Sequence, residues 1–111
     1  MIDYLIISPD GDIERRNGIL DMGTIQEVVG GDTIEELPEP LDLPVIVLAY
    51  ENAKAEGMNA NWLATSLIRQ RIHPDDFIAG TVVVAGSPDD EGDLTSIDAE
   101  TEVLIRSKAE R

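Results

Sequence analysis

The sequence predicts one small α+β domain over residues 1–111, with a mixed, mostly antiparallel sheet of about five strands and two to three helices packed on it. Three observations lead to this fold class. The length of 111 residues is near the commonest size of one domain, and no linker divides the chain. Hydrophobic residues make up 42% of the sequence, which is enough for one core. Short apolar segments typical of strands alternate with segments that carry helix start and stop signals.

The chain is predicted to begin with a hairpin. Residues 2–7 are apolar on both faces for most of their length, which is typical of a central strand. The sequence Ser8-Pro9-Asp10-Gly11 is a turn signal, so the chain should return as a second strand over residues 12–16. Asn17-Gly18 is a further turn or bulge signal.

A short helix and a short strand are expected next. Thr24 to Glu27 matches a capping box, which places a helix start at Thr24. Gly30-Gly31 can supply the left-handed residue that closes this helix. A strand is expected over residues 33–37, and the prolines at 38 and 40 must leave the sheet because proline lacks the N–H that the ladder needs.

The middle of the chain predicts a buried strand and a second helix. Residues 45–49 are apolar without alternation, as in a strand covered on both faces. Either Asn59 or Asn61 can cap a helix whose apolar stripe runs from Leu63 to Ile72, and Pro74 lies just past its end.

The last third predicts a strand and a terminal helix. The strand covers residues 77–85, where Gly80 suggests a bulge or a close backbone approach. The helix begins at Ser96 or Asp98. Its charges complement the helix dipole, with acids near the start and bases near the end: Glu100, Glu102, Arg106, Lys108 and Arg111.

Composition restricts the possible partners. With 23 acidic and 8 basic residues the formal charge is −15, so direct binding of nucleic acid is not expected. The acidity fits solubility, salt adaptation or imitation of DNA towards a basic protein, and these alternatives stay open. Because cysteine is absent, disulfides and thiolate sites are excluded. No apolar run approaches membrane-spanning length, so a cytoplasmic protein without membrane contact is expected.

Several short motifs occur in an order that resembles a known family. They are TIQEVVGG at 24–31, Ile34-Glu35, Asn61, IAGT at 78–81 and EGDLTSI at 91–97. The chain resembles the uncharacterised family numbered 3846 among the domains of unknown function. This resemblance implies an origin in a phage, plasmid or other mobile element, and it implies no particular activity. The segment 63–76, with its arginine pair, departs from the family pattern.

The acidic segment 89–100 is a candidate cation site because hard cations bind carboxylate oxygens. The candidate ligands are Asp89, Glu91, Asp93 and Glu100, at positions 1, 3, 5 and 12 of a calcium-type loop that starts at Asp89. Leu94 occupies the sixth position, where the sharp turn needs glycine. The prediction is therefore a solvated turn and no metal site, with a divalent-cation site as the alternative.

No catalytic residue and no cofactor are predicted. His73 is the only histidine and lies beside Asp75 and Asp76, but no nucleophile elbow accompanies it. The glycines lack the spacing and the lysine of a phosphate-binding loop. We therefore expect a protein that is not an enzyme.

A binding surface is predicted on the second helix. Trp62, Ser66, Arg69 and His73 recur at helical spacing and can form one face. Trp and Arg are enriched in binding hot spots. The alternative is that Trp62 covers the sheet edge. Arg69 and Arg71 are too few to hold nucleic acid on a chain of this charge.

Together these observations predict a small acidic, non-enzymatic accessory protein of a phage or mobile element. It would act in the host cytoplasm by binding an unidentified protein partner or a second copy of itself. One alternative is a regulatory module that senses a small ligand or a divalent cation at the loop after the strand that starts near Ile78. Another is an acidic DNA mimic that inhibits a nucleic-acid-binding protein of the host.

Overall fold

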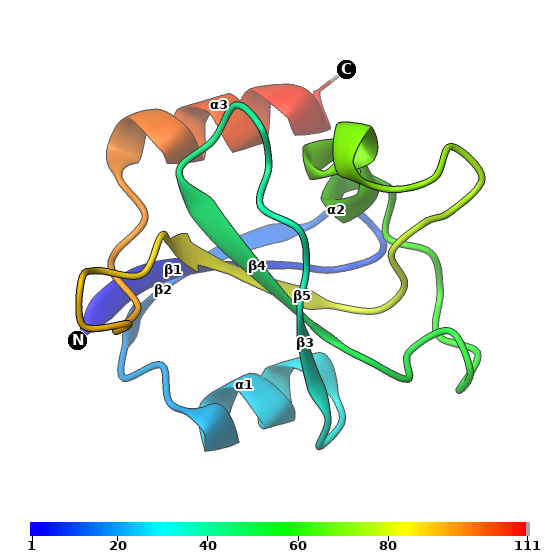
Figure 1. Ribbon diagram of the computed structural model, residues 1–111, viewed down its shortest axis with the longest axis horizontal. Coiled ribbons are helices and arrows are strands. Elements are labelled where there is room, and N and C mark those ends of the chain that lie inside the picture. Colours follow the sequence, from blue (N-terminus) through cyan, green and yellow to red (C-terminus); the bar gives the residue numbers. More distant parts are fainter. Residues whose placement is uncertain (111) are drawn as a thin grey trace.

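The computed structural model describes residues 1–110 and places a five-stranded antiparallel sheet between helices on its two faces (Figure 1). The elements are β1 (Ile2–Ile7), β2 (Ile13–Gly18), α1 (Met22–Val29), β3 (Ile34–Glu36), β4 (Val45–Tyr50), α2 (Trp62–Leu67), the 3₁₀ turn η1 (Arg69–Arg71), β5 (Val82–Gly86) and α3 (Ala99–Ala109). The strand order is β2-β1-β5-β4-β3. The predicted α+β class is confirmed. Within residues 1–110 the strand pairs are antiparallel throughout and not mixed.

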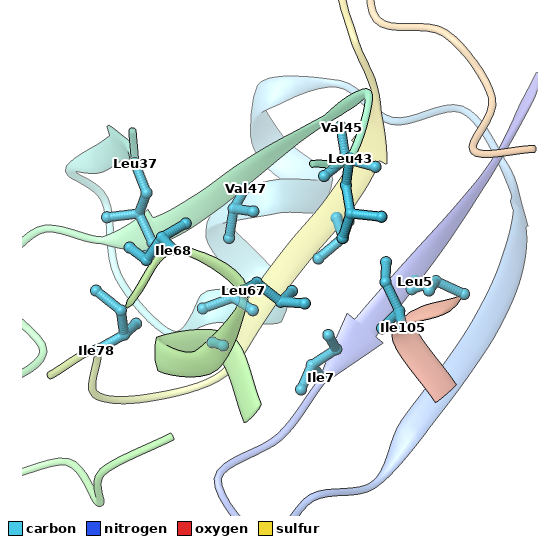
Figure 2. Close-up of a cluster of buried hydrophobic side chains, with 14 of the residues drawn as sticks. Leu5, Ile7, Leu37, Leu43, Val45, Val47, Leu67, Ile68, Ile78 and Ile105 are labelled. Atoms are coloured by element: carbon cyan, nitrogen blue, oxygen red, sulfur yellow. The ribbon is translucent and has the colours of Figure 1, made fainter. Parts of the chain in front are cut away.

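Helices cover both faces of the sheet, and this explains why three strands are apolar without alternation (Figure 1). Successive residues of β1, β4 and β5 point into two separate cores. The core beneath α2 and α3 contains Leu5, Ile7, Val45, Val47, Val82, Val84, Leu67, Ile68, Ile97 and Ile105 among others (Figure 2). The core beneath α1 contains Tyr4, Ile6, Ile25, Val29, Ile46, Leu48, Val83 and Ala85. The interpretation that these strands are covered on both faces is confirmed.

The first hairpin matches the prediction except at its far end. Gly11 adopts a φ of 91° in the turn, and its N–H donates to the carbonyl of Ser8 at 3.0 Å. Asn17-Gly18 was expected to form a turn or bulge, but both residues continue β2, where they pair with Asp3 and Ile2. The expected turn is absent because β1 is long enough to pair with β2 along its whole length.

Two aspartates begin the longer helices. The side chain of Asp21 accepts the backbone N–H of Thr24 at 2.9 Å, so the expected cap at Thr24 is wrong and Thr24 lies inside α1. Asp98 accepts the N–H of Thr101 at 2.7 Å, and Asp98 rather than Ser96 is therefore the cap of α3. These backbone hydrogen bonds hold the pKa of Asp21 and of Asp98 below the usual aspartate value.

Two predicted elements are shorter in the structure. The second helix ends at Leu67 and not near Pro74, because η1 and a loop follow it. The last strand begins at Val82 and not at residue 77, because Gly80, with a φ of 81°, interrupts the extended backbone. Arg111, predicted to end the terminal helix, lies outside the described residues. Within residues 1–110, no helix has both the length and the apolar character needed to cross a membrane.

Glu102 connects α3 to the sheet through Arg15 of β2, and it also binds Arg106 one turn along its own helix. Its carboxylate accepts from the Nε of Arg106 at 2.9 Å and also pairs with Arg15, which in turn contacts Asp3 at 2.9 Å. Burial alone raises the pKa of Glu102, but the hydrogen bonds from Arg106 and Arg15 outweigh it and hold the pKa below the usual 4.5. The pairs are therefore complete at neutral pH and weaken as Glu102 takes up a proton.

We expect Glu102→Gln to flatten the acid side of the stability curve. A carboxylate with a lowered folded pKa stabilises the fold above its unfolded pKa, and this stabilisation is lost as the pH falls through the folded pKa. Urea unfolding between about pH 7 and pH 3 should show a smaller loss for the variant than for the wild type. Glu100→Gln is the matched control, since Glu100 is exposed on the same helix and has no ion pair within residues 1–110. Equal slopes for the wild type and Glu102→Gln would contradict the role of Glu102.

Candidate functional site

An open groove of about 630 Å³ lies where the β1–β2 turn, α2 and the end of α3 meet. Its lining residues are Pro9, Asp10, Gly11, Trp62, Leu63, Ser66, Arg69, Lys108 and Ala109. A smaller hollow of about 200 Å³ shares Ser66, Arg69 and Lys108 with it and continues to Leu41, Asp42, Gln70 and Arg71. We call the two together the α2 groove. It combines an apolar part at Trp62 with a cationic part at the arginines.

Trp62 is the largest side chain of the apolar part. It is the only tryptophan of the chain and is 64% exposed. Its ring centre lies 5.6 Å from that of Phe77 and the two rings are tilted by 45°, a separation within the range of favourable aromatic pairs. The side chain is therefore held on one side by Phe77 and leaves most of its surface open to solvent.

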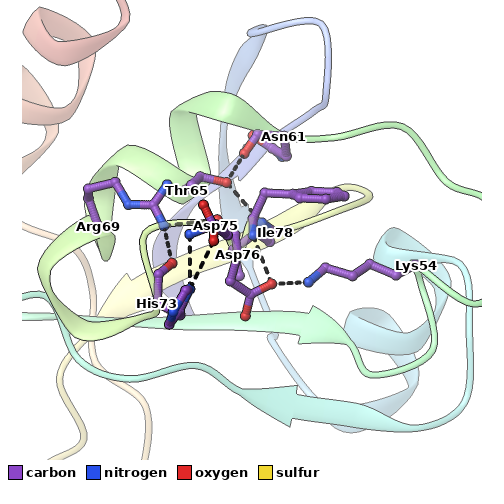
Figure 3. A network of polar contacts seen from close by, with 9 residues as sticks. Lys54, Asn61, Thr65, Arg69, His73, Asp75, Asp76 and Ile78 are labelled. Atoms are coloured by element: carbon purple, nitrogen blue, oxygen red, sulfur yellow. Dashed lines mark hydrogen bonds and ion pairs between the residues drawn. The ribbon is translucent and has the colours of Figure 1, made fainter.

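The start of α2 is fixed by Asn61, which is completely buried. Its side-chain amide donates to the carbonyls of Ile7 at 3.0 Å and Gly80 at 2.9 Å, and its oxygen accepts the N–H of Ala64 at 3.0 Å. Thr65 continues the network, because its hydroxyl donates to the carbonyl of Asn61 and accepts the N–H of Ile78 at 2.9 Å (Figure 3). Of the two predicted caps, Asn61 is the one used, and it joins α2 to β1 and to the segment before β5.

Arg69 is held where the helix has ended. Its guanidinium donates to the backbone carbonyls of His73 at 2.7 Å and Asp76 at 2.8 Å (Figure 3). Its Nε–H is buried and has no hydrogen-bond partner within residues 1–110. The acceptors are neutral carbonyls, and Arg69 forms no ion pair within residues 1–110, although its charge helps to lower the pKa of the nearby Asp76.

The structure brings together three of the four predicted interaction residues. Trp62, Ser66 and Arg69 line the α2 groove, whereas His73 does not. The helical spacing that predicted a common face stops at Leu67, so His73 lies on the following loop. There it is exposed, and its Nδ1 accepts the N–H of Asp75 at 3.1 Å.

Lys54 and Lys108 contribute to this region although the sequence did not single them out as site residues. Lys54 pairs with Asp76 and lies 4.6 Å from the centre of the Phe77 ring, a cation–π arrangement (Figure 3). The hydrogen bond from Lys54 and that from the Phe77 N–H lower the pKa of Asp76. Lys108 enters the groove from α3. No local motif could have indicated these contacts, because the partners are far apart in sequence.

The candidate cation ligands do not converge. The Asp89 carboxylate accepts the N–H groups of Glu91 at 2.9 Å and Asp93 at 3.0 Å, and Gly92 shapes this turn with a φ of 83°. Glu100 lies apart from the turn, on the first turn of α3. Within residues 1–110, no group of three or more His, Asp or Glu side chains is placed to hold a metal ion.

Fold and groove together define a small antiparallel α+β domain with helices on both faces and an open, partly apolar groove beside α2. Residues 2–108 match the family described as Domain of unknown function (DUF3846), and the chain belongs to this family. The resemblance found in the sequence motifs is thereby confirmed. No curated protein and no solved structure matches the chain.

Proposed function

We propose that this protein is a non-enzymatic binding module that recognises a partner protein through the α2 groove. One observation carries the proposal: the only tryptophan is 64% exposed beside an open groove of about 630 Å³. Trp and Arg dominate the binding energy of many interfaces. Burial of one large aromatic side chain contributes about 2 kcal/mol to association.

The architecture around Trp62 favours recognition without rearrangement. The Asn61 network fixes the first turn of α2, and Phe77 supports the indole ring. A side chain that is already held loses less conformational entropy on binding. We therefore propose a groove that is formed before the partner arrives.

We further propose that the protein serves a phage or other mobile element and acts in the cytoplasm of the host. The motif resemblance to the family supports this proposal. Sequencing the genes on either side tests the origin. Virion or replication genes would support it, whereas flanking genes of host metabolism would count against it.

We expect Trp62→Ala to weaken partner binding strongly while leaving the fold intact. Immobilised wild-type protein should capture a partner from a lysate of the native host. The amount of this partner captured by the variant should be lower by a factor of about ten or more. Because Trp62 is largely exposed, its loss should cost no more than about 1 kcal/mol of unfolding free energy.

Val103→Ala provides a matched control. Val103 is 65% exposed on α3, and it does not line the α2 groove. Its replacement should leave capture unchanged. Equal capture by the wild type and Trp62→Ala would contradict the use of the groove.

A further inference from the structure

We propose that the α2 groove binds a partner segment in which a large apolar side chain lies beside a carboxylate. This inference rests on the proposed function and specifies its ligand. The apolar side chain would occupy the part of the groove between Pro9, Trp62 and Leu63. The carboxylate would lie at Arg71, in the smaller hollow. Arg69 and Lys108 line both hollows and so connect this cationic part to the apolar part.

The distribution of cations supports the carboxylate. The whole chain has only eight basic residues, and three of them line the groove: Arg69, Arg71 and Lys108. Each of the four described cations elsewhere has a carboxylate partner, and these cations are Arg15, Arg16, Lys54 and Arg106. Arg71 is exposed and has no ion pair within the described chain. It is therefore free to receive a carboxylate from a partner.

The neighbours of Arg71 leave room for a further negative charge. The Nζ of Lys108 lies 3.6 Å from the carboxylate of Asp42 at the rim of the groove, so the charge of Lys108 is only partly compensated. Arg69 makes its hydrogen bonds to carbonyl groups and has no ion pair within residues 1–110; the nearby Asp76, on which its charge acts, is already paired with Lys54. An arginine can bind a carboxylate through two parallel N–H donors, which gives direction as well as attraction.

The overall charge of −15 does not oppose an acidic ligand at this place. At about 0.15 M salt, charges more than about 8 Å apart are largely screened, so the groove's own side chains govern the interaction. Asp10 lines the apolar part, whereas the cationic part holds three bases, Arg69, Arg71 and Lys108, and one acid, Asp42, so its net charge is positive. This polarity orients the segment with its acidic side chain towards Arg71.

A random peptide library displayed on phage tests the ligand chemistry. The purified protein is immobilised at about 0.15 M salt, and the selected peptides are synthesised and titrated by fluorescence polarisation. We expect selected sequences that combine an aromatic or long aliphatic residue with Asp or Glu. For such a peptide, Arg71→Glu should weaken binding about tenfold, because it replaces a charge-assisted hydrogen bond by repulsion.

Arg16→Glu is the control for a general charge effect. Arg16 is also exposed but lies on β2, outside the groove, and its reversal should change affinity less than about twofold. Selected peptides that are apolar without an acid, that are basic, or that tolerate Arg71→Glu would overturn this inference and leave the groove function intact. Peptides that bind Trp62→Ala as well as the wild type, or a selection without any enrichment, would overturn both proposals.

Discussion

Asn61→Ala is expected to lower the free energy of unfolding by about 3–5 kcal/mol. The change removes two donors from the buried carbonyls of Ile7 and Gly80, and each unsatisfied buried group costs about 1–3 kcal/mol. It also removes the side-chain cap of α2, which is worth about 1 kcal/mol. Urea unfolding followed by the fluorescence of Trp62, the only tryptophan, measures the loss beside the groove itself.

Two further substitutions separate this buried network from a simple capping effect. Asn59→Ala is the matched control, because Asn59 is exposed and its side chain makes no hydrogen bond within residues 1–110. We expect this substitution to change the free energy of unfolding by less than about 0.5 kcal/mol. Asn61→Asp keeps the oxygen that caps α2 but loses both amide donors and places a carboxylate against two carbonyls. It should therefore be nearly as destabilising as alanine at neutral pH. Wild-type stability for Asn61→Asp would show that capping alone matters.

The strands could be predicted from sequence because their signal is local. Residues 45–49 and 82–85 are apolar at every position, and helices on both faces of the sheet satisfy that pattern whichever way the strands run. Strand direction has no such local signal, and so the antiparallel pairing throughout the described sheet was not fully predicted. The cap of α1 shows a similar limit. Asp21 and Thr24 are both good caps, and the helix begins at the earlier of the two.

The groove could be predicted only in part. Trp62, Ser66 and Arg69 lie within a segment of eight residues, and helical periodicity predicts that they share one face. The periodicity then failed at His73, because Arg69 binds the carbonyl of His73 and the chain turns away from the helix axis. Lys108 lies in the groove solely because α3 packs beside α2. Contacts of this kind depend on tertiary structure, which no single segment encodes.

Gly86→Ala is the second substitution with a large expected effect, although Gly86 has no left-handed backbone. A Cβ at this position would lie 2.4 Å from the carbonyl oxygen of Ser96 and 2.4 Å from the hydroxyl of Thr95. Close packing of two backbones is therefore the reason for glycine here, and we expect a loss of about 2–3 kcal/mol. Thermal or urea unfolding followed by circular dichroism measures it.

The segment that Gly86 touches cannot easily move away, and this makes the clash costly. The N–H of Gly86 donates to the carbonyl of Thr95 at 2.9 Å, which holds the acidic loop against the end of β5. On its other side, the backbone N–H of Asp3 donates to the Ser96 hydroxyl and the backbone carbonyl of Asp3 accepts the N–H of Ile97, both at 2.9 Å. Gly18→Ala is the control, because nothing lies within 4 Å of a Cβ there. It should be neutral within about 0.5 kcal/mol, and an equally small effect at Gly86 would mean that residues 94–97 are free to shift.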